Sequence, residues 1–108
     1  MVACQPTLQG RRKGSPLIQG FRHKGLQRLY EKGIGKGLAA ELVPKIERIL
    51  ARLDVATSPD MMNLPGYRFH PLKGELKGFW SVWVNGNWRI VFRFNGGHVF
   101  DVDLVDYH

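Results

Sequence analysis

The sequence predicts an α+β fold, in which two N-terminal helices pack on one face of an antiparallel sheet of about four strands. Apolar residues have helical spacing in the first half of the chain, and from residue 67 onward they follow the two-residue alternation of strands. Two Asn-Gly turns divide this second half. Helices followed by hairpin-linked strands are typical of α+β proteins. At 108 residues, the chain is long enough for one domain with a modest core.

Two segments of the first half have the pattern of amphipathic helices. The first lies within residues 23–33, and the second runs from about Ala39 to Asp54. Pro44 either lies in the first turn of the second helix or marks its true start. The apolar stripes consist of Leu26, Leu29 and Tyr30, then Leu42, Ile46, Ile49, Leu50 and Leu53. Residues 17–21 could form a short strand ahead of both helices, and residues 57–60 read as a loop.

The second half predicts strands joined by tight turns. We expect them at residues 67–71, 78–84, 88–95 and 98–104, with turns at 85–87 and 95–97. The predicted core-facing residues of the last two strands are Ile90, Phe92, Phe94, Phe100, Val102 and Leu104. The predicted outward-facing residues are Arg89, Val91, Arg93, Val99, Asp101 and Asp103. A three-residue turn would set Arg89 opposite Asp103, whereas a two-residue turn would not.

Composition limits the classes of function. The formal charge of +7 favours a polyanionic partner, most simply nucleic acid and secondly an anionic membrane surface. The single cysteine, Cys4, excludes an internal disulfide and a cysteine-based zinc site, in keeping with a cytoplasmic protein. No apolar run approaches the roughly 20 residues of a membrane span. Residues 1–16 differ from the rest and predict a flexible basic extension, which leaves residues 17–108 as the domain.

The histidines and basic residues of the sequence permit metal-free cleavage of RNA. No metal-ligand spacing, phosphate-binding glycine loop or serine elbow is present. His23 and His98 read as a surface residue and a hairpin residue. His70 differs because Pro71 holds it in extended backbone, and a second histidine ends the chain. Imidazoles suit general acid and base roles near neutral pH, and arginine suits a phosphate. The structural alternative is a buried, hydrogen-bonded His70 and a frayed C-terminus.

Three stretches resemble HigB toxins of the RelE/ParE superfamily: "FRHKGLQRLYEKG", "RFHPLKGELKGFWSVWVNGNWRIVFRF" and the terminal "DYH". The resemblance covers about residues 18–108 in order. It implies a RelE-like fold and the toxin of a type II toxin–antitoxin system. It also implies a ribosome-dependent mRNA endonuclease that needs no metal or other cofactor. The implied partners are the ribosome with its mRNA and a HigA-like helix-turn-helix antitoxin, and operator DNA would be bound only through the antitoxin complex.

The resemblance also implies residue roles. His70 matches a catalytic histidine, and Lys73 and Arg89 match cations that hold the scissile phosphate. The C-terminal catalytic cluster is Asp106, Tyr107 and His108. We expect the two histidines to share acid and base work, Asp106 to orient an imidazole, and Tyr107 to stack on a base. Further RNA contacts are expected from Arg68, Lys77 and Arg93.

Two other classes of function remain open. ParE-like proteins share the fold but inhibit DNA gyrase by binding it, and the combination of His70, Arg89 and the DYH end argues against that class. A plain RNA- or DNA-binding module would use the basic face alone. Such a module predicts binding that weakens steeply with salt and yields no cleavage products.

Overall fold

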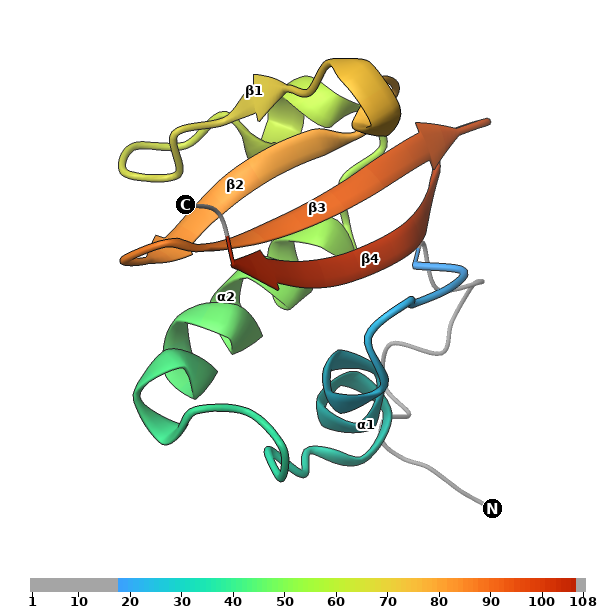
Figure 1. The fold of residues 1–108 in the computed structure, drawn as a ribbon. Coiled ribbons are helices and arrows are strands. Elements are labelled where there is room, and N and C mark those ends of the chain that lie inside the picture. The colour runs from blue at the N-terminus through green and yellow to red at the C-terminus, as the bar shows by residue number, and fades with distance from the viewer. Residues whose placement is uncertain (1–17, 107–108) are drawn as a thin grey trace.

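The computed structural model describes residues 18–106 and has an α+β fold (Figure 1). Its two α-helices are α1 (Lys24–Lys32) and α2 (Val43–Leu53), and its four strands form one antiparallel sheet in the order β1-β2-β3-β4. The strands are β1 (His70–Pro71), β2 (Trp80–Asn85), β3 (Trp88–Asn95) and β4 (His98–Asp106). The predicted class and the antiparallel sheet are therefore confirmed. The predicted extension 1–16, together with Tyr107 and His108, lies outside the described residues.

Both helices have ends that their sequence explains. His23 caps α1, because its Nδ1 accepts a hydrogen bond from the backbone N–H of Leu26 at 3.2 Å. Gly33 ends α1 in the left-handed conformation that glycine adopts without strain (φ 71°). A single 3₁₀ turn, Ala40–Leu42, precedes α2, and Pro44 lies in the first turn of that helix. The predicted helix start at Ala39 was thus a few residues early.

The N-terminal part of the sheet is less regular than predicted. Residues 18–21 form no continuous strand, but make isolated parallel bridges that join Ile18 to Val99 and Phe21 to Val102. The predicted strand 67–71 is reduced to β1, because Arg68 has a left-handed backbone (φ 49°) that interrupts the pairing. The predicted loop at 57–60 instead leads into a 3₁₀ turn, Pro59–Met62.

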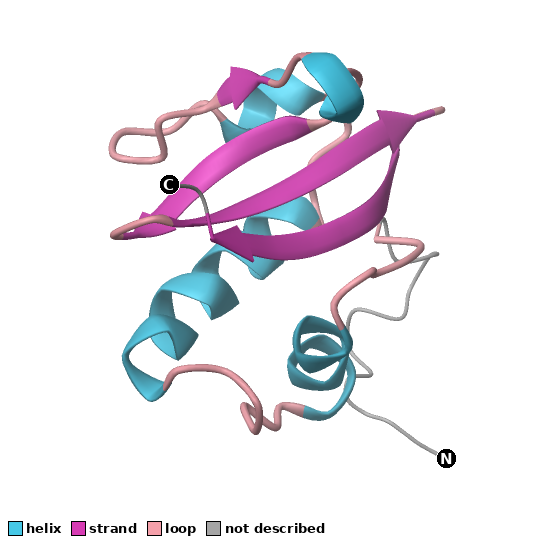
Figure 2. Ribbon diagram, viewed as in Figure 1, coloured by secondary structure: helices cyan, strands magenta, loops and turns pink. Residues whose placement is uncertain are grey.

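The main core lies between the helices and one face of the sheet, with α2 passing behind the strands in Figure 2. Both helices contribute the apolar stripes predicted from their spacing, and Ile46, Ile49 and Leu53 are fully buried. From the sheet come Val82, Val84, Ile90, Phe92, Val99, Val102 and Leu104. We call this side of the sheet the inner face. Among residues 18–106, no helix is long and apolar enough to cross a membrane.

The predicted alternation in β4 is wrong at its start, because a bulge shifts the register. Arg93 pairs with Phe100, but Val91 pairs with Asp103, so Asp101 and Val102 together lie opposite Phe92. Asp101 adopts a left-handed backbone (φ 54°) at this point. As a result Val99, predicted to face outward, is fully buried in the main core, and Phe100 pairs with Arg93 outside it.

The other side of the sheet, the outer face, has a second and smaller core. Leu72, Phe79 and Val91 are buried there, with Leu76 and Val105 packed against them. Val91 is only 1% exposed although its neighbours on the same face are Arg89 and Arg93. The outer face is therefore a polar surface built over a narrow apolar support.

Candidate active site

His70 belongs to a row of residues that crosses the outer face. His70 in β1 is opposite Ser81 in β2, which is opposite Val91 in β3, which in turn is opposite Asp103 in β4. Directly paired residues have their side chains on the same face of a sheet. The row therefore places the predicted catalytic histidine on the same face as Arg89 and Arg93, which lie two residues to either side of Val91 on β3.

Arg89 lies in the neighbouring row, opposite Trp83 on one side and Val105 on the other. With strands about 4.8 Å apart and a rise of about 3.3 Å per residue, the Cα atoms of His70 and Arg89 are about 12 Å apart. A histidine and an arginine side chain that extend toward each other can span that distance with a phosphate between them. The sheet thus brings together two residues that are 19 positions apart in the chain. Arg89 is half-buried, whereas Lys73 is exposed.

The ring of His70 has a defined hydrogen bond. Its Nδ1 is 2.9 Å from the backbone carbonyl oxygen of Arg68. A carbonyl can only accept, so Nδ1 carries a proton and donates. In the neutral imidazole, Nε2 then has the free lone pair. This arrangement suits a general base that acts through Nε2.

The side chain of Arg68 packs on an aromatic ring. Its guanidinium carbon lies 4.3 Å from the centre of the Trp83 ring, a close cation–π contact. The Trp83 indole is itself fixed, because its Nε1–H donates to the backbone carbonyl of Gly86 at 2.9 Å. Arg68, predicted as an RNA contact, is exposed and lies on the same stretch of chain as His70.

The two predicted lysines occupy the ends of one short turn. Lys73 is the N-cap and Lys77 the C-cap of the 3₁₀ turn Gly74–Leu76, which follows β1 directly. Both side chains are exposed. They extend the positive charge of the outer face beyond β1, where a flexible polyanion could reach them.

Arg93 is paired with a carboxylate. Its Nε donates to Asp101 Oδ2 at 2.9 Å, and its Nη2 lies 2.8 Å from the same oxygen. Asp101 can reach Arg93 because the bulge turns it toward the outer face. The sequence left open whether Arg89 pairs with Asp103; the turn at Gly96-Gly97 has two residues, and the pairing sets Arg89 opposite Val105 instead.

The C-terminal cluster is described only in part. Asp106 is exposed and pairs with Trp88, whose side chain packs against the main core. Strand alternation therefore assigns Asp106 to the face opposite that of Arg89. Tyr107 and His108 lie outside the described residues.

Two residues of the outer face escaped the sequence prediction. Ser81 is fully buried beside His70, and its hydroxyl finds no hydrogen-bond partner among residues 18–106. Trp83 orients Arg68. Neither residue has a sequence signal, because a serine or a tryptophan in an aromatic strand reads as packing. Within the described part of the chain, no group of three or more His, Cys, Asp or Glu side chains is placed to hold a metal ion.

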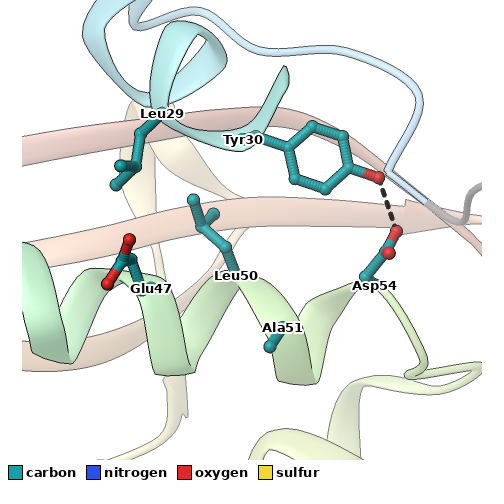
Figure 3. A pocket seen from close by; sticks show the side chains of 6 residues that line it. All are labelled: Leu29, Tyr30, Glu47, Leu50, Ala51 and Asp54. Carbon is teal, nitrogen blue, oxygen red and sulfur yellow. Dashed lines mark hydrogen bonds between the residues drawn. The ribbon is translucent and has the colours of Figure 1, made fainter. Parts of the chain in front are cut away.

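A groove lies away from the outer face, between α1 and α2 (Figure 3). It has a volume of about 220 Å³ and is lined by Leu29, Tyr30, Glu47, Leu50, Ala51 and Asp54. The Tyr30 hydroxyl donates to Asp54 Oδ1 at 2.6 Å, so these two polar groups bond to each other (Figure 3). The groove lies on the helix side of the sheet and contains none of the predicted catalytic residues.

The fold defines the class of protein. The fold is similar to that of a chain in the YoeB–YefM complex from Staphylococcus aureus. That chain superposes with a TM-score of 0.55 at 18% sequence identity, over 84% of this chain and 97% of the other. The likeness establishes a RelE-like fold.

Sequence comparison then identifies the family. The chain belongs to the HigB-like family, described as RelE-like toxins of type II toxin–antitoxin systems, which matches residues 19–108. It is 42% identical over 92 residues to a protein of Proteus vulgaris named endoribonuclease HigB, a match over 85% of this chain and all of the relative. It is 33% identical over 79 residues to toxin HigB-1 of Vibrio cholerae serotype O1, over 71% of this chain and 83% of the relative. The predicted family is confirmed, and the predicted activity agrees with the name of the Proteus relative.

Proposed function

We propose that this chain is an endoribonuclease toxin that cleaves mRNA on the ribosome without a metal ion and so inhibits translation. The observation that supports this best is the register of the sheet, in which His70 and Arg89 lie in neighbouring rows of the outer face. Family membership and the Proteus relative support the activity. The excess of positive charge favours an RNA substrate.

The chemistry is an attack by the 2′-hydroxyl of the substrate on the neighbouring phosphorus. A base removes the hydroxyl proton while the bond from O2′ to phosphorus forms, and an acid protonates O5′ as the bond from phosphorus to O5′ breaks. The products are a 2′,3′-cyclic phosphate and a 5′-hydroxyl end. His70 and His108 share the two proton transfers. Lys73 and Arg89 stabilise the negative charge that builds up on the phosphate oxygens.

The remaining predicted residues position the RNA. Tyr107 stacks on a base next to the cleaved bond, and Asp106 orients an imidazole. Further contacts with the RNA backbone come from Arg68, Lys77 and Arg93. All three are on the outer face or next to β1, and their distribution supports a strand of RNA that crosses the sheet.

Dependence on the ribosome has a physical motive. The described site is a shallow face, and a chain of 108 residues has little surface on which to hold a flexible single strand. A ribosome that presents the codon in a fixed position supplies the ordering that the toxin lacks, and positioning can lower a barrier by several kcal/mol.

Primer extension on a reporter mRNA in a translation extract tests the proposal. The unsubstituted chain should give discrete in-frame cuts, and His70→Ala and a chain that ends at Val105 should give none. The same mRNA without ribosomes is the matched control. Equal cleavage of free mRNA would refute ribosome dependence, and cleavage by both variants would refute the site.

The proposed partner is a HigA-like helix-turn-helix antitoxin, in keeping with a family of type II toxin–antitoxin systems. The toxin would reach operator DNA only through that complex, and it would act in the cytoplasm, where translating ribosomes are. Co-expression with the antitoxin should restore the growth of cells that the toxin arrests. Growth arrest with DNA damage and without mRNA cuts would favour the ParE-like alternative, and salt-sensitive binding without cuts would favour a binding module.

A further inference from the structure

Two non-glycine residues of the described chain have a left-handed backbone: Arg68 (φ 49°) and Asp101 (φ 54°). Aspartate adopts this conformation more readily than most residues, because its short side chain bonds to the local backbone. Arginine has no such advantage, and most left-handed sites are occupied by glycine. Such outliers cluster at functional sites, where the surrounding structure holds them in place. The conformation of Arg68 therefore calls for a physical reason.

Arg68 is the extra residue of a bulge. The N–H of Trp83 donates to the carbonyl of Tyr67 at 2.7 Å, so Tyr67 lies opposite Trp83. His70 lies opposite Ser81. Two residues, Arg68 and Phe69, therefore fill the space opposite Val82 alone. Bulges of this kind redirect side chains and are common beside active sites.

The bulge determines the hydrogen bond of His70. It turns the Arg68 carbonyl toward the imidazole, where the oxygen accepts from Nδ1–H at 2.9 Å. A free histidine places its proton preferentially on Nε2, but a carbonyl next to Nδ1 holds the proton there instead. In a regular strand, the backbone carbonyls point sideways toward the neighbouring strands and not toward the side chains. The Arg68 carbonyl can therefore accept a hydrogen bond from the His70 side chain only because the bulge changes its direction.

The side chain of Arg68 supports its own backbone. The guanidinium packs on the Trp83 ring at 4.3 Å, and the Trp83 Nε1–H donates to Gly86 at 2.9 Å. Trp83 therefore holds this stretch of chain at two points: its ring contacts the Arg68 guanidinium, and its backbone N–H donates to the carbonyl of Tyr67, the residue before Arg68. The turn after β2 is thereby connected to the histidine on β1.

We propose that Arg68 is a positioning residue for His70, because its left-handed backbone fixes the imidazole proton on Nδ1 and leaves Nε2 as the proton acceptor. This proposal rests on the catalytic role proposed above for His70. It makes His70 the general base of the pair His70 and His108. Nε2 takes the proton of the 2′-hydroxyl as O2′ bonds to phosphorus. The bond from phosphorus to O5′ then breaks, and the leaving oxygen takes its proton from His108, the acid.

A matched pair of substitutions separates this backbone role from RNA binding by the guanidinium. Arg68→Asn and Arg68→Val both remove the charge and the ring contact. Asparagine tolerates a left-handed backbone, whereas β-branched valine strongly disfavours it. Any loss of RNA affinity is common to both variants, and a difference between them reports the bulge.

The first readout is the position of the His70 proton, measured by ¹⁵N NMR of the full-length chain with ¹⁵N-labelled histidine at a pH where the imidazole is neutral. The signal is assigned by its loss in His70→Gln. The unsubstituted chain and Arg68→Asn should have the proton on Nδ1, and Arg68→Val should shift it to Nε2. A proton on Nδ1 in all three, or on Nε2 in Arg68→Asn, would overturn the proposal.

The second readout is cleavage on ribosomes. Both variants should raise KM alike, and Arg68→Val should also lower kcat at least 10-fold below that of Arg68→Asn. Equal kcat values would overturn the catalytic part. If Arg68→Val does not fold, Arg68→Ala gives a milder test in the same direction. Cleavage that persists in His70→Gln would refute the proposed role of His70 instead, and the NMR comparison would still decide what Arg68 does.

Discussion

The two faces of the sheet are built from the same strands and differ in almost every other respect. The inner face is covered by α1 and α2 over a continuous apolar core, and its residues on β3, Ile90 and Phe92, are fully buried. The outer face has only the small cluster around Val91 beneath His70, Arg89 and Arg93. Of the described elements, neither α1 nor α2 covers this face, and its polar side chains are therefore available to a long substrate.

This difference separates stability from chemistry. Most of the apolar burial that favours folding lies on the inner face, since the free energy gained is roughly proportional to the apolar area removed from water. The residues of the proposed reaction lie on the outer face, where side chains can be exchanged with little loss of burial. Substitutions on the two faces should therefore have separable effects, and the following experiments test that separation.

The largest expected effect is on catalysis at the outer face. His70→Gln should lower the rate of cleavage on ribosomes by about 10²- to 10⁴-fold, the usual contribution of a general acid or base. Its midpoint of urea unfolding should change little, because His70 is only partly buried. Arg48→Gln, exposed on α2, is the matched control and should keep full activity. A His70→Gln chain that is folded and active would remove His70 from the mechanism.

Substitutions of two adjacent residues on β3 compare how much each face contributes to the free energy of unfolding. Phe92→Ala should lower the free energy of unfolding by about 3–5 kcal/mol, because it leaves a cavity in the main core. Val91→Ala should cost about 2 kcal/mol, because it removes less apolar volume from a smaller cluster. Urea denaturation of both variants gives the comparison. A larger loss from Val91→Ala would mean that the outer cluster is the main support of the sheet.

The hydrogen bond between the helices should contribute modestly. Tyr30→Phe removes the hydroxyl that donates to Asp54 at 2.6 Å, and should cost about 1 kcal/mol of unfolding free energy. Cleavage on ribosomes should not change, because Tyr30 is on the helix side of the sheet. A loss of cleavage in a variant of normal stability would connect the groove between the helices to the reaction.

The smallest expected effect concerns the ion pair of the outer face. Asp101→Asn keeps a residue that tolerates the left-handed backbone, and removes the charge that pairs with Arg93. Its unfolding free energy should change by less than about 1 kcal/mol, since both side chains are partly exposed. The salt dependence of RNA binding should steepen by up to about one unit, as Arg93 becomes available to a phosphate. An unchanged slope would mean that Arg93 does not contact RNA.

The sequence predicted the elements of the fold better than their register. The helical spacing correctly predicted that Ile46, Ile49 and Leu53 are buried in the core. This prediction does not depend on where the helix begins or ends, because the 3.6-residue period alone determines which residues share a face. The place of Val99 was predicted wrongly, because one extra residue in a strand reverses the face of every residue beyond it. Nothing in "HVFDVDL" marks Asp101 as a bulge.

The candidate site was predicted in the same uneven way. The resemblance in "HPLKG" and "NWRI" singled out His70 and Arg89, and the sheet places both on the outer face. The terminal "DYH" singled out Asp106, but which face of the sheet it lies on came only from the register, which sets it opposite Trp88. The hydrogen bond from His70 to the Arg68 carbonyl had no sequence signal, because the direction of a carbonyl depends on backbone angles that no residue type imposes.

By itself, the sequence determined the α+β class, the helical faces, the antiparallel order of the strands and the family. These follow from hydrophobic periodicity, turn residues and short motifs, all of which are local properties of the chain. Only the tertiary structure decided which residues share a row across the sheet, which carbonyl His70 meets and which carboxylate pairs with Arg93. Those contacts depend on two left-handed residues, Arg68 and Asp101, whose conformation is held by the packing of neighbouring strands.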